Sequence, residues 1–264
     1  MPSLKRLSIR KGAFTVRCWT HGKGHPLVVL HGWSGLPRDT FWLESLAQRR
    51  LVIAPEFPGF GESDGLDKLD DFLDIALYHF DLFAALKLTQ ADVIGHDFGG
   101  AIAAEIAALR PSLVRKLVLV APTGLFDEKN PGVDPFATTE AELNTASWHD
   151  AEAAKKNGLI HTPQTDDEKK AAIIDRAKAL ATAGKFLFPI PDKGLKKRLS
   201  RIESPTLLIW GASDTVVPPS YARLFKRHIK STRSIAIARA GHFPMLEQPA
   251  KFTAAVTRFL DERV

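Results

Sequence analysis

The 264-residue chain contains a single cysteine, two tyrosines and no long apolar run. Cys18 has no second cysteine to pair with, and a chain of this length can bury enough apolar surface to fold without a disulfide. No apolar segment approaches the ~20 residues that a membrane-spanning helix needs. The opening stretch, MPSLKRLSIRKGAFTVRCW, alternates apolar residues with charges and lacks the apolar core of a signal peptide. We therefore expect a cytoplasmic protein that does not enter the membrane.

The distribution of charge along the chain argues against nucleic acid as a partner. The net charge is +6, but the basic residues are scattered, with one local cluster at Lys193–Arg201. Nucleic-acid binding favours basic residues interleaved with aromatic ones, and no such stripe is present. The sequence also contains no metal-ligand cluster, no phosphate loop and no dinucleotide fingerprint. We expect a small-molecule substrate, no metal and no cofactor, and the sequence has no feature that predicts an oligomeric state.

Strand-like and helix-like segments alternate along the chain. Continuous Val/Ile/Leu runs are typical of strands buried on both faces of a parallel sheet. Six stretches begin with or contain such a run, namely Pro26–Gly32, Arg50–Asp64, Ala91–Asp97, Lys116–Pro122, Thr206–Asp214 and Arg233–His242. Helical patterns lie between them at Phe72–Leu88, Gly99–Pro111, Pro219–Ile229 and Pro249–Val264, and Leu7–Gly24 resembles an antiparallel hairpin. The alternation predicts a mostly parallel, doubly wound α/β fold with the hairpin at one edge.

One region interrupts this alternation. Residues 123–200 contain no buried-strand run; they begin with a Gly/Pro/Asn-rich loop and become polar and helical. We interpret them as a helical cap inserted between the fourth and fifth core strands, with residues 1–122 and 201–264 forming the core. Because open α/β sheets bind substrates at the carboxyl ends of their strands, the cap is expected to cover the site.

The stretch VIGHDFGG fits the pattern G-x-nucleophile-x-G, with Asp97 in the middle position. A nucleophile on a tight strand-to-helix turn needs small neighbours, which Gly95, Gly99 and Gly100 provide. An aspartate is ionised at neutral pH and needs no base for its first attack. Attack on an ester carbonyl would give an anhydride, whereas displacement at a saturated carbon gives an ordinary alkyl ester. The aspartate therefore favours displacement at a saturated carbon.

Hydrolysis of that ester requires a water molecule and a general base. His242 follows the last strand and Asp214 follows the fifth, which gives the chain order nucleophile, acid, histidine. Asp127 is the alternative for the acid. The backbone N–H groups of Phe98 and Trp33 are expected to form the oxyanion hole.

His31 and Glu56 lie in loops near these residues. We predict that both are structural.

The stretches LHGWSG, PEFPGFGESD, VIGHDFGG, WGASD and AGHFPMLEQP resemble the α/β-hydrolase superfamily over essentially the whole chain. The aspartate at the elbow resembles the epoxide hydrolase and haloalkane dehalogenase branch. That resemblance implies Asp97 as nucleophile, His242 as base and Asp214 as its partner.

The chain departs from the epoxide hydrolases in its tyrosines. Those enzymes donate a proton from cap tyrosines, but Tyr78 and Tyr221 both lie outside the expected cap. This departure disfavours epoxide hydrolysis unless His149 or His161 takes over the proton donation.

The chain departs from the dehalogenases at the residue after the nucleophile. Haloalkane dehalogenases usually have tryptophan there to cradle the halide, and fluoroacetate-type relatives have arginine, whereas this chain has Phe98. Trp148 and His149 in the expected cap, together with Trp33, could rebuild a halide cradle. We therefore predict that Trp148 and His149 bind substrate.

Other stretches, such as LVLVAPTGLF, resemble serine-type hydrolases of esters or carbon–carbon bonds. Three hypotheses follow: a hydrolase with an aspartate nucleophile acting on a small apolar halide or epoxide, a serine-type scaffold that is weak or inactive because of Asp97, and a non-catalytic ligand-binding protein.

Overall fold

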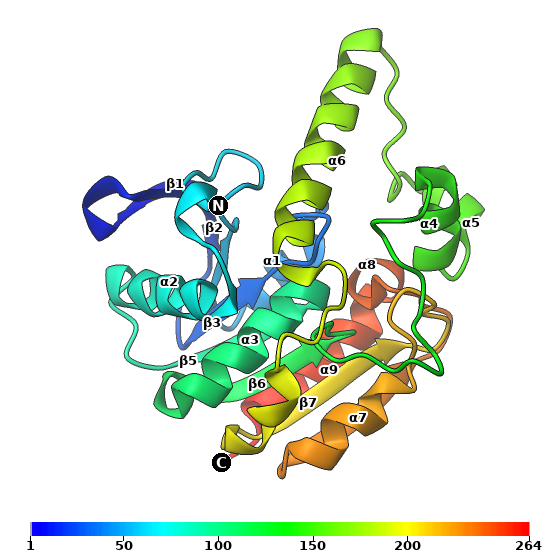
Figure 1. Ribbon diagram of the computed structural model, residues 1–264. Coiled ribbons are helices and arrows are strands. Elements are labelled where there is room, and N and C mark those ends of the chain that lie inside the picture. Colours follow the sequence, from blue (N-terminus) through cyan, green and yellow to red (C-terminus); the bar gives the residue numbers. More distant parts are fainter. Residues whose placement is uncertain (1, 264) are drawn as a thin grey trace.

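A computed structural model describes residues 2–263 of the chain, which form one eight-stranded sheet covered by helices (Figure 1). The strands lie in the order β1-β2-β4-β3-β5-β6-β7-β8. Their bounds are β1 Ser3–Ile9, β2 Phe14–His21, β3 Pro26–Leu30, β4 Leu51–Pro55, β5 Ala91–His96, β6 Val114–Val120, β7 Thr206–Gly211 and β8 Thr232–Ile237. β1 and β2 form an antiparallel hairpin, β2 pairs antiparallel with β4, and all remaining pairs are parallel. The predicted fold class and the edge hairpin are confirmed.

Burial follows the position of each strand in the sheet. β5 and β7 are buried along their whole length, as their uninterrupted apolar sequences predict. β8 differs from the prediction, because it has β7 on one side only and exposes half of its residues. Its Arg233 forms an exposed ion pair with Glu262. This charged residue, at the start of the predicted run Arg233–His242, is therefore a sign that the strand lies at the edge of the sheet.

Helices cover both faces of the sheet. Buried residues of α2, α3 and α7 belong to one apolar cluster, and those of α1, α8 and α9 belong to a second one. Their bounds are α1 Phe41–Ala47, α2 Phe72–Ala85, α3 Asp97–Leu109, α7 Tyr221–His228, α8 Pro244–Glu247 and α9 Pro249–Asp261. Short 3₁₀ helices lie at Arg10–Gly12, Leu66–Lys68, Pro111–Leu113, Leu195–Lys197 and Leu199–Arg201. Asp71 begins α2 by accepting hydrogen bonds from two backbone N–H groups of the first turn.

Three helices lie between β6 and β7, where the sequence predicts a helical insertion. They are α4 Glu140–Ser147, α5 Ala151–Lys156 and α6 Asp166–Leu187. Thr139 with Glu142 and Thr165 with Glu168 form capping boxes that begin α4 and α6. Figure 1 shows α6 projecting away from the sheet, with α4 and α5 beside it. Its last turn returns to the core, where Phe186 is buried.

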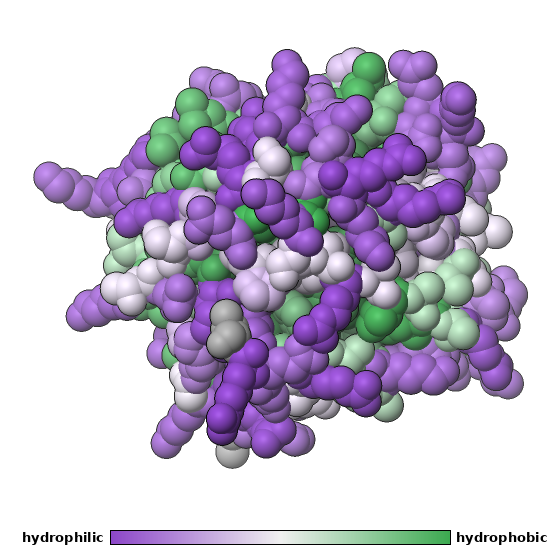
Figure 2. All heavy atoms as spheres, turned by 90° about the horizontal axis from the view of Figure 1, so that it is seen from below, coloured by the Kyte–Doolittle hydropathy of each residue, from purple (hydrophilic) through white to green (hydrophobic). Residues whose placement is uncertain are grey.

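Along residues 2–263, none of the helices combines the length and the apolar character required to cross a bilayer. Figure 2 shows the face turned away from α6, on which hydrophilic side chains predominate and apolar residues occur in small groups between them.

Lys116 of β6 ties the central sheet to the end of the last helix. Its side chain is almost fully buried, and its Nζ donates to the carbonyl oxygens of Phe259 at 2.7 Å and Glu262 at 2.5 Å. A cation that satisfies carbonyl groups at a helix C-terminus stabilises that end. We expect Lys116→Met to lower the free energy of unfolding by about 2 kcal/mol, measured by urea denaturation. Lys251→Met, on an exposed position of the same helix, is the control, and an equal effect of both changes would contradict this role.

Candidate active site

Asp97 lies at the turn between β5 and α3, where it is the first residue of the helix. Asp97 has a left-handed backbone with φ of 51° and is fully buried. A side chain on Gly99 would approach the carbonyl oxygens of Leu30 and His31 to 2.3 and 2.4 Å, so only glycine fits there. The strained residue is thus held by close packing of the elbow against β3.

The carboxylate of Asp97 is bound asymmetrically. Its Oδ2 accepts a hydrogen bond from the backbone N–H of Trp33 at 2.8 Å, and the backbone N–H of Phe98 also donates to the carboxylate. Its Oδ1 is buried and has no hydrogen-bond partner. The two N–H groups expected to bind an oxyanion therefore both hold the side chain of Asp97, which leaves one oxygen free.

His242 and Asp214 complete the arrangement. The Nδ1 of His242 lies 2.9 Å from Oδ2 of Asp214, and its Nε2 lies 3.9 Å from the free Oδ1 of Asp97. Nε2 has no hydrogen-bond partner. The other oxygen of Asp214 accepts from the N–H groups of Val216 and Val217, both at 3.0 Å. The structure brings the three predicted residues together.

Asp127, the alternative acid, lies elsewhere. Its Oδ1 accepts from the N–H of Lys129 in its own loop, and His242 is hydrogen-bonded to Asp214 instead.

Burial and charge shift the pKa values of this pair. Burial raises the pKa of Asp97, against the opposing effects of His242 and of the Trp33 and Phe98 N–H groups. For His242, burial acts to lower the pKa, but the charge and hydrogen bond of Asp214, followed by the charge of Asp97, raise it above its ordinary value. The imidazole is therefore more basic while Asp97 carries its charge.

A small cavity of about 90 Å³ borders Asp97. Its wall is mainly apolar and is formed by both the core and the insertion: Trp33, Asp97, Thr123, Leu125, Pro131, Val133, Asp134, Pro135, Phe136, Leu187, Pro189, Pro191, Val216, Val217 and Tyr221. Two polar atoms of this wall, Nε1 of Trp33 and Oγ1 of Thr123, are buried without a partner. Across residues 2–263, six buried side-chain N or O atoms are unpartnered, and four of them belong to Trp33, Asp97, Thr123 and His242. Buried polar groups are normally paired, so this concentration of unpaired groups indicates a ligand site.

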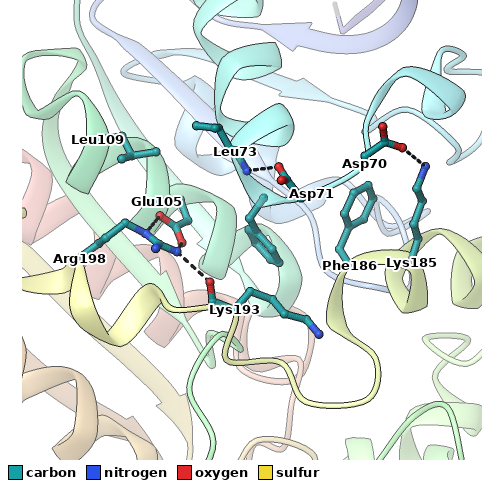
Figure 3. Close-up of a pocket in the computed structure, with 10 residues that line it drawn as sticks. Asp70, Asp71, Leu73, Glu105, Leu109, Lys185, Phe186, Lys193 and Arg198 are labelled. Carbon is teal, nitrogen blue, oxygen red and sulfur yellow. Dashed lines mark hydrogen bonds and ion pairs between the residues drawn. The ribbon is translucent and has the colours of Figure 1, made fainter.

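A larger cavity, of about 520 Å³, lies between α2, α3, α6 and the segment 193–198 (Figure 3). Its charged groups already have partners, because Arg198 pairs with Glu105 and Lys185 with Asp70. Its lining has no counterpart to Asp97, whose backbone is left-handed and whose Oδ1 has no partner. We therefore place the candidate active site at the smaller cavity.

Trp148 and His149, predicted to bind substrate, do not line this cavity. The ring of Trp148 packs on Phe243 with centroids 5.1 Å apart, and Nδ1 of His149 is hydrogen-bonded to Oγ of Ser213 at 2.7 Å. The segment that carries them lies against the loops of Asp214 and His242.

His31 and Glu56 are engaged in hydrogen bonds and an ion pair in loops near the site. The Nε2 of His31 accepts from the N–H of Phe57 at 3.0 Å, which leaves its Nδ1 to donate to the carbonyl of Gly32 at 2.8 Å. Glu56 is buried and paired with Arg17. Neither side chain lines the cavity beside Asp97.

Sequence reasoning missed Thr123 and Tyr221. Thr123 lies just after β6, and the rule that sites form at the carboxyl ends of parallel strands could have identified it. Tyr221 reaches the cavity from α7, and its hydroxyl accepts from the N–H of Asp127 at 3.1 Å. No local pattern signals this contact, because it depends on how the segment 127–136 folds over α7.

Comparison with known proteins places this geometry in a family. A model described as the alpha/beta hydrolase fold matches residues 25–249. A pimeloyl-[acyl-carrier protein] methyl ester esterase of Shewanella woodyi is 29% identical over 256 residues, which cover 91% of this chain and 96% of the esterase. A 2-hydroxymuconate semialdehyde hydrolase of a Pseudomonas species is 30% identical over 261 residues, covering 91% and 88%. A meta-cleavage product hydrolase of Pseudomonas fluorescens has a similar structure, with a TM-score of 0.77 at 20% identity and 97% of both chains covered.

None of these relatives is described as an epoxide hydrolase or a dehalogenase, so the comparisons do not support the narrower resemblance drawn from Asp97. They support a hydrolase. The chain belongs to the alpha/beta hydrolase fold family.

Proposed function

We propose that this hydrolase uses Asp97 to displace a leaving group from a saturated carbon and then hydrolyses the resulting alkyl ester. The observation that carries the proposal is the asymmetric binding of the carboxylate. Oδ2 accepts from the Trp33 N–H, one of the two expected oxyanion-hole donors, while Oδ1 has no hydrogen-bond partner and lies 3.9 Å from the unpartnered Nε2 of His242. In an enzyme that attacks esters, the substrate carbonyl oxygen would have to occupy that donor.

The first step forms one bond and breaks one. Oδ1 of Asp97 attacks the substrate carbon, and the leaving group departs with the electron pair of its former bond. The Trp33 N–H holds Oδ2 so that Oδ1 keeps a fixed direction. No base is required, because the carboxylate is already the nucleophile.

The second step returns the enzyme to its starting state. His242 takes a proton from water, and the water oxygen attacks Cγ of Asp97. Negative charge then develops on Oδ2, to which the Trp33 N–H already donates. Collapse breaks the bond between Cγ and the alkyl-bearing oxygen, and the product alcohol takes the proton from His242. The second hydrogen of the water remains on the new carboxyl group of Asp97 and is lost to solvent, which restores the carboxylate. Asp214 orients the imidazole throughout.

The proposed leaving group is a weakly basic anion such as a halide. The unpartnered Nε1–H of Trp33 and hydroxyl of Thr123 in the cavity wall can donate hydrogen bonds to such an anion. The small volume and apolar wall favour a short alkyl chain. Residues 123–200 act as a cap in this proposal, because Leu125, Val133, Phe136 and Leu187 of this region close the cavity.

Isotope labelling tests the proposal. Short primary haloalkanes are incubated with excess enzyme in H₂¹⁸O for a single turnover. The product oxygen then comes from Asp97, so the label is expected in the Asp97 carboxylate and not in the alcohol. Label in the first-turnover alcohol would exclude the ester intermediate, and absence of product from a panel of alkyl halides and epoxides would favour the ligand-binding hypothesis.

Trp33→Phe is expected to slow the first step roughly 10- to 100-fold, since it removes one hydrogen bond to a charged leaving group but keeps the backbone N–H. Halide release measured by stopped flow gives this rate. Trp42→Phe is the matched control, because its Nε1 is also buried and unpartnered but does not border the cavity. Equal rates for Trp33→Phe and wild type would remove Trp33 from the leaving-group site.

A second candidate function is ester hydrolysis, favoured by the similarity to the Shewanella woodyi esterase. Asp97 would make this activity weak, because its Oδ2 occupies the Trp33 N–H, a donor that an ester carbonyl needs. Asp97→Ser is then expected to raise hydrolysis of aryl esters above wild type. No gain would count against this candidate.

A further inference from the structure

The end of α4 is fastened to both loops that carry the proposed base and its acid partner. The backbone N–H of His242 donates to the carbonyl of Ser147 at 2.6 Å. The hydroxyl of Thr215, next to Asp214, donates to the carbonyl of Ala146 at 2.9 Å. Segment 146–149 thus contacts the backbone of one catalytic loop and a side chain of the other.

Glu247 joins the same two parts of the molecule. Its Oε2 accepts from the backbone N–H of Gly241 at 2.6 Å, and its Oε1 accepts from the backbone N–H of His149 at 2.7 Å. One carboxylate therefore bridges the residue before His242 and the end of segment 146–149. Both acceptors are required, since each oxygen serves a different N–H group.

The backbone at Gly241, next to His242, lies too close to segment 146–149 for a side chain to fit. A Cβ atom on Gly241 would lie 2.4 Å from the carbonyl oxygen of Ser147 and 2.9 Å from the carbonyl carbon of Trp148. Trp148 is itself buried against Phe243, the residue after His242. The His242 loop therefore has its position set by the insertion on one side and by Glu247 on the other.

We infer that Glu247 is a positioning residue that holds the His242 loop against segment 146–149 and so fixes His242 for attack of water on the ester. The effect on the rate of ester breakdown rests on the proposed function. The hydrogen bonds of the Glu247 bridge do not depend on it. It also gives Trp148 and the backbone of His149 a role in the site although neither residue borders the cavity. Because His242 acts only in the second step, loss of the bridge affects ester breakdown and not ester formation.

Two variants separate geometry from charge. Glu247→Gln keeps the length but turns one acceptor into an N–H₂ donor, so it cannot accept from both N–H groups. Glu247→Asp keeps the charge but is one methylene too short to span them. Both are expected to slow ester breakdown roughly 10- to 100-fold, the cost of a displacement near 1 Å, with the rate of leaving-group release unchanged. Accumulation of the alkyl ester in intact-protein mass spectra measures this split.

The matched control is Gln248→Ala, which removes a hydrogen bond from the same loop to the Arg239 carbonyl but leaves the bridge intact. It is expected to retain wild-type breakdown. Wild-type ester breakdown in either Glu247 variant would overturn the positioning role, and so would equal slowing of both steps, which indicates a general loss of structure.

NMR of the histidine ring tests the bridge without any substrate. In Glu247→Gln the pKa of His242 is expected to fall, because the Glu247 charge, with those of Asp214 and Asp97, raises it. In Glu247→Asp the Nδ1 proton that faces Asp214 is expected to exchange faster with water. Unchanged exchange in Glu247→Asp would overturn the inference even if an ester forms. Faster exchange in a protein that forms no ester would sustain the bridge while the proposed function fails.

Discussion

Asp97→Asn is expected to lower turnover of alkyl substrates by at least about 10⁴-fold, measured as halide release under saturating substrate. Asparagine has nearly the same shape and tolerates the left-handed backbone at this position. Its amide oxygen can still accept from the Trp33 N–H, which leaves the amide nitrogen where Oδ1 lies. That nitrogen has no available electron pair for attack on carbon, so the first step stops while the cavity keeps its shape.

Asp134→Asn is the control for this change. Asp134 borders the same cavity but is exposed, and the substitution is the same in chemistry and size. It is expected to retain activity. Intact mass must show that the amide introduced by Asp97→Asn has not hydrolysed back to the carboxylate, because His242 is placed to direct water at the amide carbon. Full activity of a verified Asp97→Asn protein would exclude Asp97 as the nucleophile.

The elbow and its partners could be predicted because their signals are local. The close approach of β3 to α3 leaves room only for glycine at position 99, and this glycine is part of the G-x-nucleophile-x-G pattern in the sequence. Asp214 and His242 each follow an apolar strand, and parallel strands bring their carboxyl ends together at one edge. A topology rule therefore converts separated positions into one site without any knowledge of the packing.

The substrate-binding residues could not be predicted in the same way. Trp148 is a buried aromatic in the insertion, and composition alone does not say which way such a ring faces. Its orientation follows from long-range contacts, because Ser147 and His149 are bound to the loops of His242 and Glu247. Tyr221 belongs to the core by sequence but borders the cavity, since the wall is shared between the core and the insertion.

Phe98 illustrates how backbone and side chain of one residue can differ in predictability. Its N–H was expected to face the reacting oxygen, and in the structure it donates to the Asp97 carboxylate. Its ring turns away and stacks on Phe186 of α6, with centroids 6.0 Å apart. The position that is tryptophan in dehalogenases thus anchors the returning end of α6. The unpartnered indole in this site belongs to Trp33 instead.

The charge on Asp97 links the two proposed steps. In the free enzyme it is one of the interactions that raise the pKa of His242. Formation of the ester removes this charge, so the pKa of His242 falls and the imidazole releases its proton more readily. A histidine protonated in the free enzyme can therefore become neutral when a base is required, and the acid limb for ester breakdown is expected at a lower pH than the His242 pKa of the free enzyme.

His242→Ala is expected to stop the reaction at the alkyl ester. Asp97 needs no base for the first step, so the variant should still release one leaving group per enzyme molecule. Breakdown should be about 10²- to 10⁴-fold slower, which is the usual contribution of a general base. The increase in intact mass should equal the alkyl group less the one hydrogen that it replaces, and peptide mapping should locate it at Asp97. His161→Ala, at an exposed histidine of the insertion, is the control and should show no adduct.

The pH dependence of breakdown distinguishes a missing base from a damaged site. In wild type, breakdown requires neutral His242, so its rate should decrease as the pH falls through the pKa of that histidine in the ester form. In His242→Ala the residual breakdown should lose this acid limb, because no imidazole remains to be protonated. A variant that forms no adduct with any alkyl halide or epoxide, while wild type turns over aryl esters, would instead place this chain with the ester hydrolases that it resembles in sequence. If the adduct forms but its breakdown keeps the wild-type acid limb, a group other than His242 must act as the base. Asp97 and Asp214 cannot take this role, because the ester engages Asp97 and buried hydrogen bonds engage Asp214.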